Sequence, residues 1–156
     1  MQNNLKIALI QSDLVWENPE QNRINFTKKI DAISEEIDVI ILPEMFTTGF
    51  TMNASNVAET MDGKTVSWMK NMASKTHSAI IGSLIISENA NFHNRLLFTE
   101  PTGDITIYDK RHTFTLVGED KTYTAGKEKA IIDTSYVGFE LKNAPALDKG
   151  FIATVK

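Results

Sequence analysis

Two short apolar runs on either side of an amphipathic segment constrain the fold of this chain more than any other feature. Residues 5–11 and 39–42 are rich in Ile, Leu and Val and have the length of buried strands. Between them, Asn18 and Pro19 form a helix-start pattern. The apolar side chains that follow recur at helical spacing: Phe26, Ile30, Ile33 and Ile37. This strand–helix–strand order predicts an α/β fold in which helices cover a sheet.

The same kind of pattern continues as far as residue 133. The expected elements are a helix at about 64–75 and strands at 79–86, 95–99, 105–109 and 130–133. Residues 110–126 have no regular pattern, which predicts a loop. Residues 134–156 show no sustained period, and Pro145 interrupts them. We therefore divide the chain into a domain portion, residues 1–133, and a divergent tail, residues 134–156, which is expected to be irregular.

Charge and composition exclude several classes of protein. The 156 residues suffice for one domain, and a net charge of −4 argues against a nucleic-acid partner. The chain has no cysteine, which excludes disulfides, thiolate metal sites and a thiol nucleophile within it. No apolar run has the length of a membrane span or a signal peptide, so a cytoplasmic protein is the default expectation. The spacing of His77, His93 and His112 does not suit a metal site, and no nucleotide-binding motif is present, so no metal or cofactor is expected.

Glu44 combines an unusual position with useful chemistry. It follows the apolar run 39–42 directly after Pro43, at the end of a strand, where the ligand sites of α/β sheets form. Proline restricts the backbone there, and burial would raise the pKa of the carboxyl group toward the range of a general base. The alternative is an ordinary strand-end glutamate turned to solvent, and the local sequence leaves both open.

Two further charged residues are candidates. Lys110, in "IYDKRHTF", follows a predicted strand as Glu44 does, and it could pair with a carboxylate or stabilise an oxyanion. The alternative is that Lys110 and Arg111 form a solvated basic pair at a turn, which this segment on its own favours. Glu119, in "LVGEDKTYTAG", is on its own an ordinary loop acid.

Four segments together resemble the nitrilase superfamily of carbon–nitrogen hydrolases, and most closely its omega-amidase branch. In chain order they are "KIALIQSDLVWENPEQNRINF", "DVIILPEMFTTGFTM", "NRLLFTEPTGDITIYDKRHTF" and "GEDKTYTAGKEKAIID". The second and third are the most specific. The resemblance covers approximately residues 5–133 and implies part of an α-β-β-α sandwich.

The resemblance also implies roles for individual residues. That family uses a Glu–Lys–Cys triad with a further supporting Glu, which would make Glu44 the general base, Lys110 the oxyanion stabiliser and Glu119 the supporting acid. The loop after Glu44 would lie beside the pocket, and its candidates for substrate contact are Phe46, Thr48 and Phe50. The substrate class implied is small ω-amides of dicarboxylic keto acids, such as 2-oxoglutaramate, with no cofactor.

The chain departs from that family at the nucleophile. The cysteine would be expected on a strand after "GKEKAIID", but the sequence continues "VGFELKNAPALDKGF". Ser135 is the nearest hydroxyl and lies before the expected position, so it is not a replacement. Three explanations remain: a truncated or frame-shifted copy, which the loss of pattern after Asp133 favours, a deliberate fragment, or a non-catalytic derivative.

Functional and physical expectations follow from the missing nucleophile. The intact parent would hydrolyse a small ω-amide through a thioester, whereas this chain would be inactive alone. The alternative is a non-catalytic binding or assembly module that associates with an intact homologue. Without further strands, residues 5–10 and 81–86 should have an unpaired neighbour and uncovered apolar area. We therefore expect a poorly soluble or oligomeric chain, with a homo-oligomer as one form of association.

Overall fold

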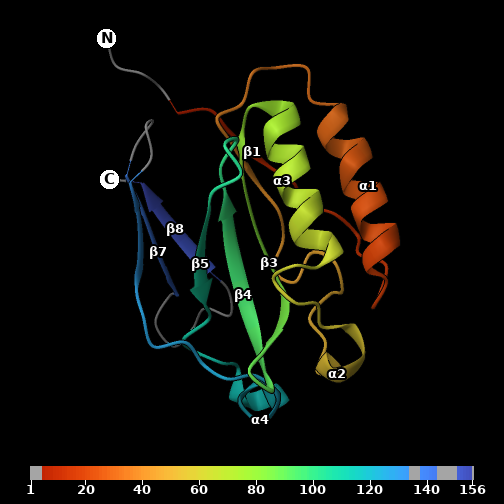
Figure 1. Cartoon of the computed structure of the whole chain (residues 1–156), viewed down its shortest axis with the longest axis vertical. Helices are drawn as coiled ribbons and strands as arrows, with labels where there is room; N and C mark the ends of the chain where they lie inside the picture. The colour runs from red at the N-terminus through yellow and green to blue at the C-terminus, as the bar shows by residue number, and fades with distance from the viewer. Residues whose placement is uncertain (1–4, 134–137, 144–150, 156) are drawn as a thin grey trace.

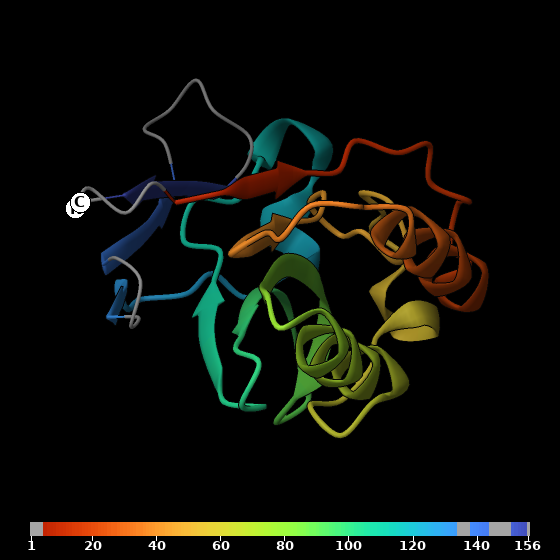
Figure 2. The ribbon, with the colours of Figure 1, turned by 90° about the horizontal axis from the view of Figure 1, so that it is seen from above.

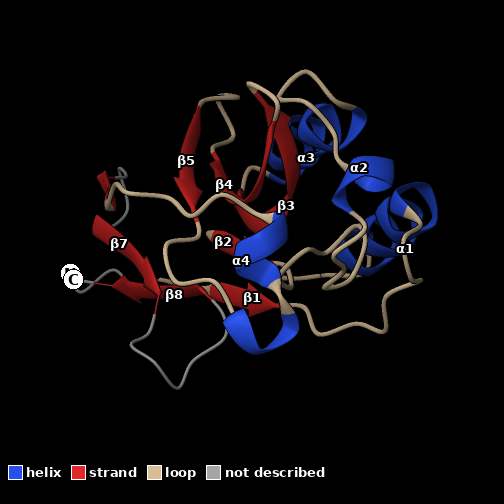
Figure 3. Cartoon of the chain, turned by 90° about the horizontal axis from the view of Figure 1, so that it is seen from below, coloured by secondary structure: helices blue, strands red, loops and turns tan. Residues whose placement is uncertain are grey.

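The fold consists of a five-stranded sheet with helices on one face and a smaller sheet on the other side (Figures 1 and 2). A computed structural model of the protein describes residues 5–133, 138–143 and 151–155. Figure 3 shows helices α1 and α3 at one side and strands β7 and β8 at the opposite side. The predicted α/β class is therefore confirmed, with two sheets in contact as in a partial α-β-β-α sandwich.

The order and directions of the strands determine where the strand ends meet. The large sheet contains, in spatial order, β1 (Ile7–Leu9), β2 (Val39–Ile41), β3 (Ala79–Glu88), β4 (Asn91–Thr99) and β5 (Ile105–Asp109). The first three strands are parallel, and β4 is antiparallel to both β3 and β5. Consequently β5 runs in the same direction as β2, and the carboxyl ends of both strands lie at the same edge of the sheet.

Two helices of similar length cover one face of this sheet. They are α1 (Pro19–Asp31) and α3 (Lys64–Thr76), and a short helix, α2 (Ala54–Val57), precedes α3. Asn18 caps α1 by accepting a hydrogen bond from Gln21 N, as its position before Pro19 predicted. Both predicted helices are confirmed, although α1 ends before Ile33 and Ile37. No helix in the described ranges is both long and apolar enough to cross a membrane.

The main core lies between the helices and the sheet. Its buried members include Phe26, Ile40, Phe46, Val66, Met69, Ile80, Leu84 and Leu97. Ile33 and Ile37 pack against this core from beyond the end of α1, which explains why they continue the apolar pattern. Phe46 lies directly over β3, because a Cβ atom at Gly82 would come within 2.9 Å of its ring.

The first strand differs from its prediction as a buried element. β1 forms where expected, but 44% of Ile7 and 74% of Leu9 are exposed. Among the described strands it is the last in the large sheet and pairs only with β2. The expected uncovered apolar area is therefore confirmed at β1. It is wrong for residues 81–86, because all of them are buried and pair with β4 on one side, while Ile81 also pairs with β2 on the other.

The small sheet changes the prediction for the tail. It is antiparallel, in the order β6 (Ala130–Asp133), β7 (Gly138–Asn143) and β8 (Phe151–Val155). The irregular structure expected for residues 134–156 is therefore wrong for 138–143 and 151–155, while Ser135 and Pro145 lie outside the described residues. The sequence of β7 does alternate polar and apolar residues, but over too few positions to stand out.

Candidate active site

Glu44, Lys110 and Glu119 come from three separate elements to one end of the large sheet. Glu44 lies just after β2 and Lys110 directly after β5, and these strands end at the same edge. Glu119 begins the short helix α4 (Glu119–Thr122), which Figure 1 shows at that end of β4 and β5. The loop predicted for residues 110–126 thus contains α4 and a 3₁₀ turn at Thr115–Val117.

Lys110 bridges the two carboxylates. Its Nζ lies 2.9 Å from Glu44 Oε1 and 3.0 Å from Glu119 Oε2. The side chains of Lys110 and Glu119 are 1% and 0% exposed, while that of Glu44 is 22% exposed. The alternative prediction, that Lys110 belongs to a solvated basic pair with Arg111, is therefore wrong. Charged groups buried this deeply require partners of opposite charge. Here Lys110 is the partner of both carboxylates, and the carboxylates are its partners.

The turn after Glu44 is anchored on β3. Met45 has a φ of 46°, in the left-handed region that non-glycine residues rarely adopt. Its N–H donates to Ser83 Oγ at 2.8 Å, and Phe46 N–H donates to Ser83 O at 3.1 Å. The direction of the Glu44 side chain is therefore determined by contacts with the neighbouring strand, in addition to the restriction from Pro43.

Asn94 is a fourth member of the cluster, and sequence reasoning did not single it out. Its Nδ2 donates to Glu44 Oε1 at 2.7 Å and to Glu119 Oε1 at 3.3 Å. Asn94 lies on β4 and is 2% exposed. A buried amide within the mainly apolar segment "NRLLF" could have identified it, but the predicted strand began one residue later, at Arg95.

Glu119 is fixed by backbone as well as by Lys110. Phe114 N–H donates to Glu119 Oε2 at 2.5 Å. The far end of α4 is held by Tyr123, whose hydroxyl donates to Thr51 O at 2.6 Å. Burial, with the nearby charges of Glu119 and Glu17, raises the pKa of Tyr123, so this hydroxyl stays a donor at neutral pH. The helix is thereby tied to the loop that follows Glu44.

Electrostatics favour a proton-accepting role for Glu44. Burial raises the pKa of its carboxyl group above the usual 4.5, and the charge of Glu119 acts in the same direction. Lys110 and Asn94 oppose this rise but do not cancel it. A carboxyl group whose pKa is raised can accept and return a proton closer to neutral pH. The lysine beside it can stabilise a developing negative charge.

The sequence matches one protein family over most of its length. The profile of the carbon–nitrogen hydrolases matches residues 6–146. The chain belongs to this family. Omega-amidase YafV of Yersinia enterocolitica is 39% identical over 129 residues, which cover 83% of this carbon–nitrogen hydrolase chain and 50% of the relative. The 2-oxoglutaramate amidase of Bacillus subtilis is 30% identical over 125 residues, 78% of this chain and 48% of the relative.

Solved structures agree with the fold of this carbon–nitrogen hydrolase chain. A CN-hydrolase superfamily protein of Xanthomonas campestris, which carries an arsenic adduct in its active site, superposes with a TM-score of 0.85 at 34% identity. The match covers 89% of this chain and 52% of that protein. The nitrilase-type fold is thus confirmed, and the chain spans about half the length of the curated relatives it matches.

The three loop residues predicted to contact substrate have different environments. Phe46 is fully buried and packs edge-on against Phe26, with 5.5 Å between ring centroids. Thr48 is also buried, and its hydroxyl donates to Gly49 O. Core positions of this kind do not support substrate contact by Phe46 or Thr48. Phe50 is half-buried, and its ring centroid lies 5.0 Å from Lys110 Nζ, so this residue adjoins the cluster.

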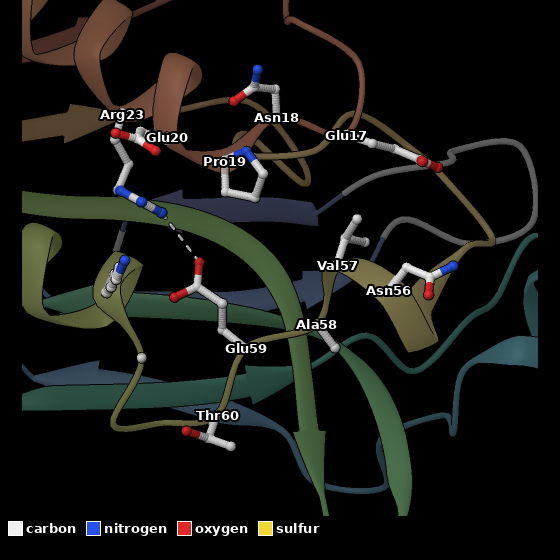
Figure 4. A pocket seen from close by; sticks show the side chains of 12 residues that line it. Glu17, Asn18, Pro19, Glu20, Arg23, Asn56, Val57, Ala58, Glu59 and Thr60 are labelled. Atoms are coloured by element: carbon white, nitrogen blue, oxygen red, sulfur yellow. Dashed lines mark hydrogen bonds and ion pairs between the residues drawn. The ribbon is translucent and has the colours of Figure 1, made fainter.

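A separate open cavity of about 550 Å³ lies at the start of α1 and α3 (Figure 4). Its lining includes Arg23 and Glu59, whose Nη1 and Oε1 atoms are 3.3 Å apart. Glu59 also accepts a hydrogen bond from Thr65 N at 2.8 Å, near the start of α3. These charges stabilise the helix start and its contact with α1. The cavity lining includes none of the four residues of the buried cluster.

Proposed function

We propose that this chain carries the base, the cation and the supporting acid of an omega-amidase-type active site. The single observation behind the proposal is the buried Glu44–Lys110–Glu119 cluster, in which one lysine contacts both carboxylates. The proposed substrates are small ω-amides of dicarboxylic keto acids, such as 2-oxoglutaramate. Relatives named omega-amidase and 2-oxoglutaramate amidase support this substrate class.

Amide hydrolysis assigns a separate task to each of these residues. An amide is a poor electrophile, so the reaction needs an activated nucleophile and a positive charge where the tetrahedral oxyanion develops. Glu44 accepts the proton of the nucleophile, returns it to the departing ammonia, and then accepts a proton from the attacking water. Lys110 stabilises the oxyanion. Glu119 balances the charge of Lys110 while Glu44 is protonated, so the buried cluster never holds an unpaired cation.

The nucleophile is the part that this chain does not supply. A thioester requires a thiol, and the sequence contains no cysteine. A single-residue mutant of the amidase of Nesterenkonia sp. AN1, which shares the fold at 16% identity and a TM-score of 0.78, carries acrylamide added at its active-site cysteine. We therefore propose that the chain alone does not complete the hydrolysis.

Joining this chain to the second half of a relative should give an active enzyme. Residues 1–133 would be joined to the part of the Yersinia omega-amidase that follows its matched segment. We expect this chimera to release ammonia from 2-oxoglutaramate, and Glu44→Gln to lower its rate by about 10²–10⁴-fold, the usual contribution of a general base. The unmodified chain should release none above the uncatalysed rate.

Two results would contradict these proposals in different ways. Ammonia release by the unmodified chain would disprove the inactive assignment. A chimera that melts cooperatively but does not hydrolyse 2-oxoglutaramate would disprove the substrate assignment. A chimera in which the relative's cysteine is replaced by alanine controls for contaminating amidases.

The exposed apolar surface of β1 favours a second candidate function, association with an intact homologue. Ile7 and Leu9 lie on the last described strand of the large sheet, where a further strand could pair. We expect the purified chain to form oligomers or to co-purify with a full-length omega-amidase, and Leu9→Lys to weaken that association. Analytical ultracentrifugation is the measurement, with Leu116→Lys, on an exposed turn, as the control. A monodisperse monomer that does not bind the homologue would exclude this candidate function.

A further inference from the structure

We propose that Asn94 is a positioning residue of this site, whose side-chain amide holds the carboxylates of Glu44 and Glu119 in place around Lys110. The inference rests on the proposed function and adds a member to the same site. It begins from one contact pattern: a single Nδ2 atom donates to both carboxylates, at 2.7 Å and 3.3 Å. Lys110 bridges the same two groups with its own nitrogen.

Strand register places the two donors side by side. β4 and β5 pair Arg95 with Asp109, and Lys110 N–H donates to Asn94 O at 3.0 Å in the next position. The Arg95 guanidinium contacts both carboxylate oxygens of Asp109, at 2.7 and 2.9 Å, which stabilises this register. A slip by one residue would turn Asn94 to the other face of the sheet. The alignment of Asn94 with Lys110 is therefore built into the pairing.

The orientation of the Asn94 amide is determined by charge. Nδ2 donates both side-chain hydrogen bonds, while Oδ1 is buried and has no hydrogen-bond partner among the described residues. Turning the amide over would place Oδ1 against two carboxylates, with acceptor facing acceptor. The orientation that directs Nδ2 at both acids is therefore the one that the two negative charges favour.

The uncharged nature of this donor is chemically useful. Two carboxylates and one ammonium give the buried cluster one net negative charge, and a second cation would remove it. Asn94 orients Glu44 without adding charge. Among the described residues, both Lys110 and Asn94 donate to Oε1 of Glu44, so neither occupies Oε2. Glu44 can then exchange a proton through Oε2 while the other oxygen stays fixed.

A titration of the intact chain tests this role without any turnover. The carboxyl carbon of Glu44 would be followed by NMR against pH, with Glu44→Gln providing the assignment. The Asn94 hydrogen bond lowers the pKa of Glu44 against the effect of burial, so losing it should raise that pKa. Asn94→Leu, which keeps the shape and removes the donor, should raise it by roughly one unit, given the usual strength of a hydrogen bond to a charged group. Asn91→Leu, at an exposed position of β4, should leave it unchanged.

A second measurement needs no variant of Asn94. In the wild-type chain, the Nδ2 protons of Asn94 should shift with the same midpoint as the Glu44 carboxyl carbon. In the Glu44→Gln chain that transition should disappear. The inference would be overturned if a folded Asn94→Leu chain had an unchanged titration midpoint for Glu44. It would also be overturned if the chemical shifts of the Asn94 Nδ2 protons did not change as Glu44 titrates. Failure of the amidase proposal would instead appear only in the ammonia assay.

Discussion

Replacing Lys110 with methionine should lower the free energy of unfolding by about 3–5 kcal/mol at neutral pH, the usual cost of removing one partner from a buried ion pair. Methionine matches the length of the lysine stem, so the change removes the charge with little loss of volume. Glu119, with 0% of its side chain exposed, would then be buried near Glu44 with no cation between them. The measurement is urea unfolding followed by circular dichroism.

The loss should become smaller as the solution is acidified. Two carboxylates without Lys110 can remain buried only by taking up protons, and low pH supplies them. The matched control is Lys75→Met, because Lys75 pairs with Asp31 at 2.6 Å but both side chains are largely exposed. That surface pair should contribute less than about 1 kcal/mol. If Lys110→Met were as stable as Lys75→Met at pH 7, the buried ion pairs would not stabilise the fold as argued.

Glu44→Gln should stabilise the chain at neutral pH, although it would remove the proposed general base. The folded state raises the pKa of Glu44, chiefly through burial, so it binds this proton more tightly than the unfolded state. This group therefore stabilises the fold below its unfolded pKa, near 4.5, and loses that contribution as pH rises through the folded value. Glutamine does not ionise, so the Glu44→Gln chain does not lose this stabilisation as pH rises. The gain at pH 7 should be about 1.4 kcal/mol for each unit by which the pKa is raised.

Urea unfolding at pH 7 and at pH 4 tests the sign of this effect, since the gain in stability from Glu44→Gln should be small at pH 4. Glu88→Gln is the control of opposite sign. The hydrogen bonds of Glu88 with Arg95 lower its pKa, so its contribution is present above the unfolded pKa and is lost as pH falls. Solvent screening makes that effect small. A Glu44→Gln chain less stable than wild type at pH 7 would show that its contact with Lys110 outweighs its burial.

A stabilising substitution at Glu44 would also have a functional meaning. Groups whose surroundings destabilise the folded state are concentrated at active sites, where the same surroundings are needed for the reaction. The adjoining Met45 also has an unfavourable conformation, a left-handed backbone that is stabilised by hydrogen bonds such as the one from its N–H to Ser83 Oγ. Both features lie in the one turn that directs Glu44 toward Lys110.

The sequence by itself determined most of the strands and the two long helices up to residue 133, and it marked two of the charged positions. Apolar runs and helical spacing predicted β2, α1 and α3, because the period of a pattern reports which side of an element is buried. The position of Glu44 and Lys110 just after predicted strands marked both as candidates. Sequence blocks such as "LPEMFTTGF" and "YDKRH" identified the family, which the profile match over residues 6–146 confirmed.

Only the tertiary structure decided how the side chains meet. Lys110 and Glu44 are 66 positions apart, and Asn94 and Glu44 are 50 apart, so no local pattern connects them. Their contact follows from the shared direction of β2 and β5 and from the register of β4, which depend on pairing across the whole sheet. The same applies to burial: Phe46 enters the core, Phe50 adjoins Lys110, and Leu9 remains exposed on the last described strand of the large sheet. The spacing of apolar residues shows which face of a helix or strand is buried. Which residues pack against that face depends on the order of the strands in the sheet.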